Sequence, residues 1–145
     1  MLELSLRLVD LVERNADKLT KRWLHDVKKH PGTRTYHAYD ETQLYQRAYR
    51  VYSHFGKWMS NETTKEDIEN LYTALGRQRR KEGYELSEVI QALIITRRHV
   101  WLLVQYEGFM DTALELYQAL GLVNRAVLFF DRAIYFTAVG YEMED

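Results

Sequence analysis

Residues 87–107 read SEVIQALIITRRHVWLLVQYE, which we expect to form the most apolar helix of the chain. Apolar side chains recur at steps of three and four and also fill positions between those steps, so they cover most of the circumference of a helix. Such a helix usually lies at the centre of a fold. We expect it over about 88–107, capped by Ser87 and ended by Gly108. Its apolar positions are Val89, Ile90, Leu93, Ile94, Val100, Trp101, Leu103 and Val104.

Helical patterns flank this segment on both sides. One proline, Pro31, and seven scattered glycines favour long helices over a sandwich or barrel. Residues 31–40 form the one obvious long loop, and Asn15 marks a possible bend in the first helix. The expected fold is therefore an all-α bundle of about five to six helices. The other expected helices cover about 2–30, 41–60, 65–83 and 111–141.

Local end signals support these boundaries. Asp40 is placed to cap the helix that follows it, and Thr64 with Asp67 resembles a capping box. Gly83 is placed as the glycine that ends the same helix. The last helix, about 111–141, is longer than usual, so we expect part of it to pack on a partner or to act as an output connector.

Composition indicates one soluble domain over residues 1–145. The formal net charge is -1, so no global positive field attracts nucleic acid. Cysteine is absent, which excludes disulfides, thiolate metal sites and cysteine nucleophiles. The longest uninterrupted apolar runs, Val100–Val104 and Ala126–Phe130, are too short to span a bilayer, and no secretory signal is visible. We therefore expect a cytoplasmic protein without a membrane span.

Motifs of known chemistry are absent from the sequence. No two of the seven glycines are closer than seven positions, which excludes the dinucleotide, serine-nucleophile and P-loop signatures. The Glu-x-x-His and His-Glu-x-x-His patterns of metal sites do not occur. We therefore expect no enzyme activity, no metal site and no cofactor. His54 with Lys57 faintly resembles a phosphotransfer motif, which leaves a histidine phosphotransfer bundle as a weak alternative.

Two polar clusters have ordinary structural explanations. The basic run Arg77–Lys81 lies in the last turns of a helix, where cations are favoured, so a solvated face is preferred over a nucleic-acid site. Arg97, Arg98 and His99 interrupt the most apolar helix. One helix cannot bury all three on the same side, so at least one should face water, a carboxylate or a pocket.

Several stretches resemble one known family. They are LGRQRR at 75–80, EGYELSEVIQAL at 82–93, RRHVW at 97–101, FFDRAIYF at 129–136 and GYE at 140–142. This pattern resembles the N-terminal sensor domain of RsbR-type stressosome co-antagonists, a bacterial family of non-haem globin-like domains involved in regulation of the stress response. The resemblance covers nearly the whole chain and rests on helix patterns. It implies a globin-like fold that dimerises and passes a signal through its C-terminal helix to an output domain or partner protein. The sequence stops at Asp145 without such a module.

Histidine positions allow a check on haem binding. A globin holds haem through a histidine on the helix before its last two long helices. The expected helix at 65–83 contains none, His54 lies on the helix before it, and His99 lies on the helix after it. The sequence thus argues against ordinary haem binding, with a haem-binding globin sensor left as an alternative.

The preferred hypothesis is a non-enzymatic sensor domain that acts as a homodimer. A ligand or partner would shift the equilibrium between two packings of the dimer. The last helix would transmit this change to an output domain or partner protein. Core packing within one chain is an equally open interpretation of the candidate interface. The candidate interface residues, spaced four, three and four apart, are Val123, Val127, Phe130 and Ile134.

The second hypothesis is a receptor or carrier for a small apolar ligand, such as a fatty acid, held between the central helices. The high aromatic content is compatible with a lined cavity, although core packing is its default interpretation. The candidate lining residues are Phe55, Trp58, His99, Trp101 and Tyr135.

Overall fold

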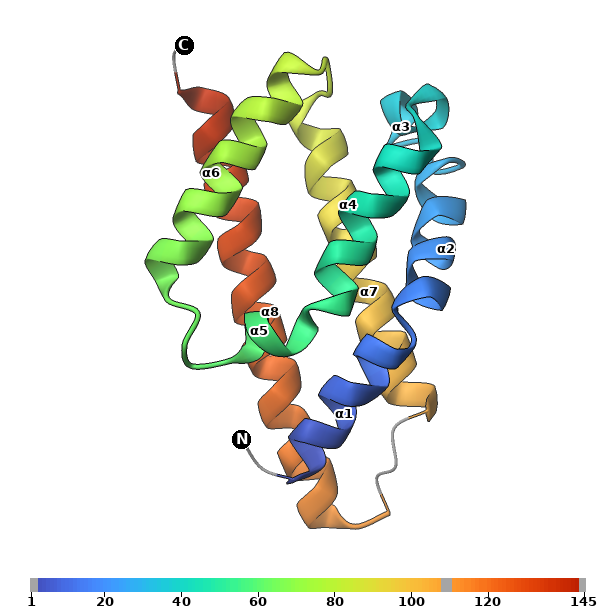
Figure 1. Cartoon of the computed structure of the whole chain (residues 1–145), viewed down its shortest axis with the longest axis vertical. Helices are drawn as coiled ribbons and strands as arrows, with labels where there is room; N and C mark the ends of the chain where they lie inside the picture. The colour runs from blue at the N-terminus through green and yellow to red at the C-terminus, as the bar shows by residue number, and fades with distance from the viewer. Residues whose placement is uncertain (1–2, 108–110, 144–145) are drawn as a thin grey trace.

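The computed structural model describes residues 3–107 and 111–143 (Figure 1). These residues form eight helices and no strand, which confirms the all-α class and shows that the expected five to six helices were too few. The helices are α1 Glu3–Arg14, α2 Ala16–Val27, α3 Arg34–Ala38, α4 Glu41–Ser53, α5 Phe55–Met59, α6 Lys65–Lys81, α7 Leu86–Glu107 and α8 Ala113–Glu142.

The additional helices arise where an expected helix breaks or a loop coils. At Asn15 the backbone leaves helical geometry, and the side-chain amide donates to the Leu11 carbonyl at 2.8 Å instead of capping α2. A similar break at His54 separates α4 from α5. Within the expected loop, burial of the Tyr36 ring against the rings of Trp23 and Tyr84 holds the short helix α3.

Most local end signals act as the sequence predicted. The Asp40 carboxylate accepts from the Thr42 amide at 3.0 Å. Thr64 and Asp67 form a reciprocal capping box, with distances of 2.9 and 3.1 Å. Gly83 has a φ of 94°, the left-handed geometry that favours glycine. Ser87 does not cap α7, because that helix already begins at Leu86; Gly108 lies outside the described residues.

Helix α7 is anchored to the N-terminal half of the molecule through its backbone. The Trp23 indole donates to the Ala92 carbonyl at 3.0 Å, and the Tyr52 hydroxyl donates to the Thr96 carbonyl at 3.1 Å. Polar side chains interrupt the first half of α7. The Ala92 and Thr96 carbonyls in this half accept additional hydrogen bonds from side chains of α2 and α4. Of the apolar positions expected to lie inside, Val89, Val100, Leu103 and Val104 are buried, whereas Ile90, Leu93 and Ile94 are partly buried and Trp101 is exposed.

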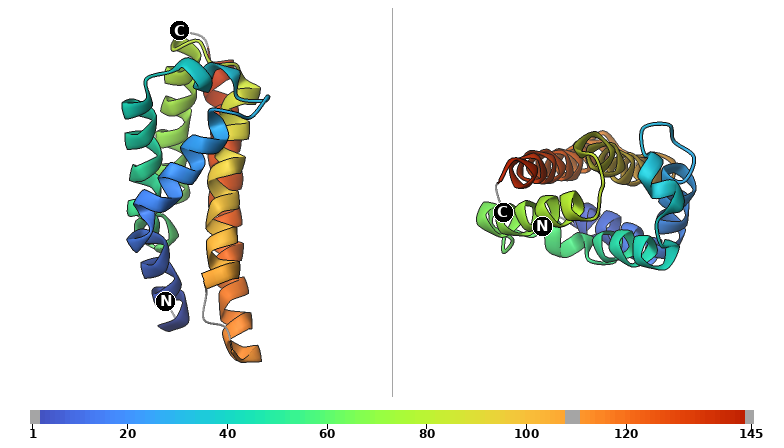
Figure 2. Two further views of the ribbon diagram at one scale, coloured as in Figure 1. Left: turned by 90° about the vertical axis from the view of Figure 1, so that its right-hand side faces the viewer. Right: turned by 90° about the horizontal axis from the view of Figure 1, so that it is seen from above.

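Helices α7 and α8 lie side by side as one layer, and α4 and α6 lie in the other (Figure 2). Helices α6 and α8 approach most closely at two glycines. A Cβ atom on Gly76 would collide with the Thr137 carbonyl, and one on Gly140 would collide with the Thr73 carbonyl. The C-terminal half of α8 is therefore fixed against α6 at backbone contact. Its first turns extend beyond the end of α1 (Figures 1 and 2).

Candidate functional site

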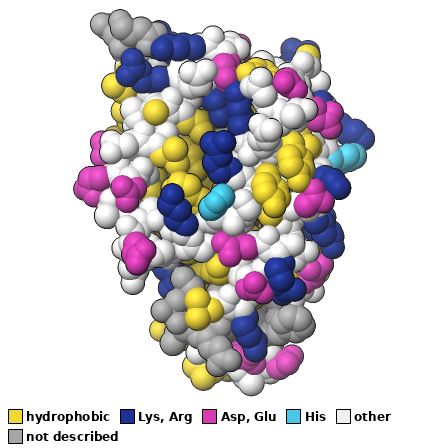
Figure 3. Space-filling model, in the orientation of Figure 1, with side chains coloured by type: hydrophobic (Ala, Val, Ile, Leu, Met, Phe, Trp, Pro, Cys, Tyr) yellow, Lys and Arg dark blue, Asp and Glu magenta, His cyan; other side chains and the backbone are white. Residues whose placement is uncertain are grey.

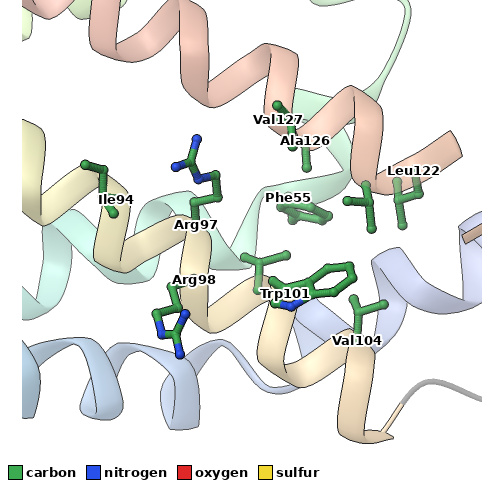
Figure 4. Close-up of a pocket in the computed structure, with 11 residues that line it drawn as sticks. Phe55, Ile94, Arg97, Arg98, Trp101, Val104, Leu122, Ala126 and Val127 are labelled. Carbon is green, nitrogen blue, oxygen red and sulfur yellow. The ribbon is translucent and has the colours of Figure 1, made fainter. Parts of the chain in front are cut away.

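An apolar groove of about 390 Å³ lies where α5, α7 and α8 meet (Figure 4). We call it the α7–α8 groove. Phe55 of α5 lies at its inner side and is almost fully buried, whereas Trp101 of α7 is substantially exposed. The full set of lining residues is Phe55, Ile94, Arg97, Arg98, Val100, Trp101, Val104, Leu122, Val123, Ala126 and Val127.

The spacing of side chains on the two helices explains the groove. On α7, Arg97, Trp101 and Val104 follow at steps of four and three, so they share one helical face. On α8, Ala126 follows Leu122 by one turn and carries only a methyl group. The small side chain leaves open the space between the larger groups on α7 and Phe55. The groove is thus a consequence of a small residue placed opposite an aromatic one.

Of the two arginines that line the groove, Arg97 points towards α8 and Arg98 points to the other side of α7 (Figure 4). Arg97 reaches from α7 towards α8, and its guanidinium lies 3.5 Å from the Asp131 carboxylate (Figure 4). Both groups are exposed enough for water to screen the pair, so it adds little stability. Arg98 is exposed and has no ion pair or hydrogen bond within the described part of the chain. An apolar ligand with one acidic end suits such a surface.

The five sequence-predicted lining residues do not share one site. Phe55 and Trp101 both line the α7–α8 groove. Trp58 packs on Phe129 with 5.4 Å between ring centroids and lines a different cavity. Tyr135 is 64% exposed on the surface of α8. The structure therefore brings two of the five together.

His99, the remaining candidate, links two helices. Its Nε2 atom lies 2.6 Å from the Asp26 carboxylate of α2, and the side chain is mostly buried. It faces the side of α7 opposite the groove lining, where Asp17, Lys21 and Arg22 of α2 also lie. The pair explains how α7 accommodates a polar residue among apolar ones.

The candidate interface residues divide between the core and the surface. Phe130 is 1% exposed and belongs to the core, so it is unavailable to a partner; Val123 lines the groove. Val127 is exposed and Ile134 is partly buried. Apart from Val127, the exposed apolar side chains of α8 form a stripe on a different side of the helix from the expected interface residues, and this side faces solvent. We call it the outer face of α8; its members are Leu116, Tyr117, Leu120, Val127, Leu128 and Tyr135.

Helix α8 is more apolar than α7, so the expectation that residues 87–107 form the most apolar helix was wrong. By length and composition alone it is the one helix in 3–107 and 111–143 that could cross a membrane, and 28% of its most apolar window is buried. Uninterrupted apolar runs do not detect this property, because charged residues are spaced through the helix. The absence of a membrane span remains a prediction.

Sequence reasoning missed much of the groove. Ile94, Val104, Leu122 and Ala126 were assigned no site role, although their spacing at helical steps on two neighbouring helices was a usable signal. The prediction that at least one of Arg97, Arg98 and His99 faces water, a carboxylate or a pocket is confirmed. Arg97 lies beside the Asp131 carboxylate and lines the groove, and His99 lies beside the Asp26 carboxylate. In the described residues, no group of three His, Asp or Glu side chains could hold a metal ion.

Comparisons with protein-family models, with curated proteins and with solved structures found no match to this chain.

Proposed function

We propose that this chain is a non-enzymatic regulatory domain that acts as a homodimer through the outer face of α8. The observation that carries the proposal is the concentration of exposed large apolar side chains on one helix. The exposed apolar side chains of α8 recur at helical spacing, and exposed apolar patches mark interaction sites. The resemblance to RsbR-type sensor domains supports the same function and a globin-like arrangement of the helices.

The spacing on the outer face suits a second copy of α8. Leu120 and Val127 of the outer face are seven residues apart, and the partly buried Ile134 follows after seven more, the repeat that keeps a seam facing a partner helix. Asn124 and Asp131 interrupt the seam at the same spacing. Polar residues at such positions fix the register of paired helices at a cost in stability. In a two-fold dimer, Asn124 and Asp131 of one chain lie close to the same residues, or to neighbouring seam residues, of the other chain.

A signal could pass through unequal anchoring of α8. Its C-terminal half is held at backbone contact with α6 through Gly76 and Gly140, whereas the α7–α8 groove separates its middle from α7. Val127 contributes both to the groove and to the outer face. A molecule that fills the groove would therefore bias the position of α8 and with it the dimer seam.

The oligomeric state tests the proposal. We expect wild-type protein to sediment as a dimer and the double variant Leu120→Glu/Leu128→Glu to sediment as a folded monomer, because two buried charges per chain would face an apolar seam. Both side chains are exposed and neither lines the groove, so the monomer should keep its helical circular dichroism. The control, Leu71→Glu on α6, replaces a similarly exposed leucine and should remain a dimer. Wild-type protein that stays monomeric at about 100 μM would contradict the proposal.

A second candidate function is the binding of a small, mostly apolar carboxylic acid, such as a fatty acid, in the α7–α8 groove. The observation that favours it is an apolar groove of about 390 Å³ with the Arg97 guanidinium at its edge. Native mass spectrometry, before and after denaturation, measures whether such a molecule is retained. Dodecanoate retained by wild-type protein and lost in an Ala126→Trp variant, which fills the groove, would support this candidate. Retained mass equal to haem would point instead to a haem-binding globin sensor.

A further inference from the structure

A second cavity, of about 310 Å³, opens between α4, α5 and α6. We call it the α4–α6 pocket. Figure 3 shows Lys and Arg side chains gathered between α6 and α4, with hydrophobic side chains beside them. None of the residues that line the pocket is acidic. Its basic members are Arg47, Arg50, His54, Lys57 and Arg79.

The positive charge of the pocket is only partly neutralised. Glu82 lies 2.7 Å from the Arg47 guanidinium and 3.2 Å from that of Arg79, so one carboxylate serves two arginines. Burial alone would raise the pKa of Glu82, but the hydrogen bonds from Arg47 and Gln78 and the nearby arginine charges lower it, which keeps this carboxylate ionised. Of the cations that line the pocket, Arg47 and Arg79 thus share one carboxylate.

Arg50 and Lys57 are the cations without an ion-pair partner in the described part of the chain. Lys57 lies 5.3 Å above the Trp58 ring and helps to lower the pKa of Asp67. The Asp67 carboxylate is itself engaged by the Thr64 amide in the capping box. Both cations are exposed at the mouth of the pocket, where they can reach a ligand.

Two buried hydrogen-bond donors at this pocket lack an acceptor. The Nη1 atom of Arg47 and the Nε1 atom of Trp58 are buried without a partner, and both residues line the pocket. A buried donor left unpaired costs about 1–3 kcal/mol. Both atoms are donors only, so what they lack is an acceptor oxygen or nitrogen. A ligand rich in acceptors would supply one.

The remaining surface of the pocket is apolar and includes flat rings. The partly buried Trp58 contributes aromatic surface, and Leu71 has much exposed area at the edge of the pocket; the Tyr72 ring, which also lines it, is almost fully buried. Such a surface favours a planar, apolar group on the ligand. An alkyl chain with one carboxylate would leave most of the positive charge unmatched, whereas phosphate brings several acceptor oxygens and close to two charges per group.

We propose that the α4–α6 pocket binds a small phosphate ester with a planar ring, of the nucleoside phosphate class. The ring lies against Trp58 and Leu71, and Arg50 and Lys57 bind the phosphates at the mouth. Arg47 donates its free Nη1–H to an oxygen of the ligand. This site is separate from the α7–α8 groove, and its existence does not depend on the dimer.

Isothermal titration calorimetry with ADP tests this site, with adenosine and pyrophosphate as partial ligands. We expect ADP to bind saturably, and both adenosine and pyrophosphate to bind at least about tenfold more weakly, because each lacks one half of the recognised chemistry. Affinity for ADP should also fall as salt concentration rises. Absence of saturable ADP binding up to about 1 mM would overturn the proposal.

Paired variants localise the binding. Arg50→Gln/Lys57→Gln removes two exposed cations and should weaken ADP binding at least about tenfold without changing thermal stability. Arg22→Gln/Lys29→Gln, the matched control on exposed cations of the α2 region, should bind ADP as wild type does. Equal affinity of the pocket variant and wild type would place the binding elsewhere. Pyrophosphate binding as tight as ADP, or tighter binding of single-stranded oligonucleotides, would also overturn the assignment.

Discussion

At the scale of single residues, Glu88 is the side chain whose role the sequence conceals most. It belongs to the resemblance pattern, yet nothing in its neighbours predicts a buried carboxylate. Its oxygens accept from the Thr35 amide at 2.6 Å, the Thr35 hydroxyl at 2.7 Å and the Glu85 amide at 3.0 Å. One side chain thus both caps the start of α7 and ties α3 to it.

The environment of Glu88 predicts a pH dependence of stability. Burial alone would raise the pKa of Glu88, but the hydrogen bonds from Thr35 and Glu85, with His37 nearby, lower it below its usual value of 4.5. The stabilisation is therefore complete above about pH 4.5 and is lost as the pH falls through the lowered value.

We expect Glu88→Gln to lower the free energy of unfolding by about 1–3 kcal/mol at neutral pH, because the amide cannot accept all three hydrogen bonds. Urea denaturation at neutral pH and in acid measures the difference, which should narrow in acid as wild-type Glu88 becomes protonated. Glu85→Gln, at an exposed position on the same turn, should change stability by less than about 0.5 kcal/mol. A difference that stays constant with pH would show that the charge of Glu88 does not stabilise the fold.

Residue-scale prediction succeeded where the signal was local. Asp40, Thr64 and Gly83 act within one turn of their own helix, so their neighbours in sequence suffice to predict them. The expectation that Trp58 and Tyr135 line one cavity fails, because periodicity assigns a residue to a face of its helix without identifying the partner helix. The structure puts one against Phe129 and the other in solvent.

At the scale of elements, the pairing of α6 with α8 depends on two glycines. Their contact is at backbone level, so a methyl group at either position has no flexible side chain to displace. Sequence alone does not predict this pairing, because a glycine within a helical pattern indicates a weak point of the helix until the partner helix is known.

We expect Gly76→Ala and Gly140→Ala each to destabilise the fold by about 1–3 kcal/mol, because the added Cβ collides with a carbonyl of the other helix. Gly121→Ala is the matched control within α8. A Cβ there meets nothing within 4 Å, so the better helix propensity of alanine should stabilise the protein by about 0.5–1 kcal/mol. Thermal unfolding measures all three. Equal effects at the three positions would mean that propensity, and not the α6–α8 contact, dominates.

Helix boundaries were predicted well for α6 and α8 but not for the first half of the chain. The expected helix at 41–60 is divided at His54, where the backbone turns so that Phe55 enters the core. The apolar spacing continues across this break, which is why the pattern indicated one helix. Continuity of an apolar face does not require continuity of the helix.

At the scale of the whole molecule, the α7–α8 groove and the outer face of α8 meet at Val127. A residue that belongs to both sites is expected in a sensor whose two sites are coupled, and is not expected in a domain that carries two unrelated sites. If groove occupancy and dimerisation both depend on the position of α8, each must change the other by the same factor in equilibrium affinity.

Dodecanoate provides a probe of that coupling. We expect saturating dodecanoate to shift the dimer dissociation constant by about 5-fold or more in analytical ultracentrifugation, and the monomeric Leu120→Glu/Leu128→Glu variant to differ from wild type in dodecanoate affinity by the same factor. The Ala126→Trp variant, with its groove filled, should dimerise with an affinity that dodecanoate no longer changes. Tight dodecanoate binding that leaves the dimer constant of wild type unaltered would separate the two sites, because a ligand with equal affinity for both arrangements of α8 shifts neither. The protein would then be a carrier whose dimer has another purpose, and α8 would not transmit occupancy of the groove.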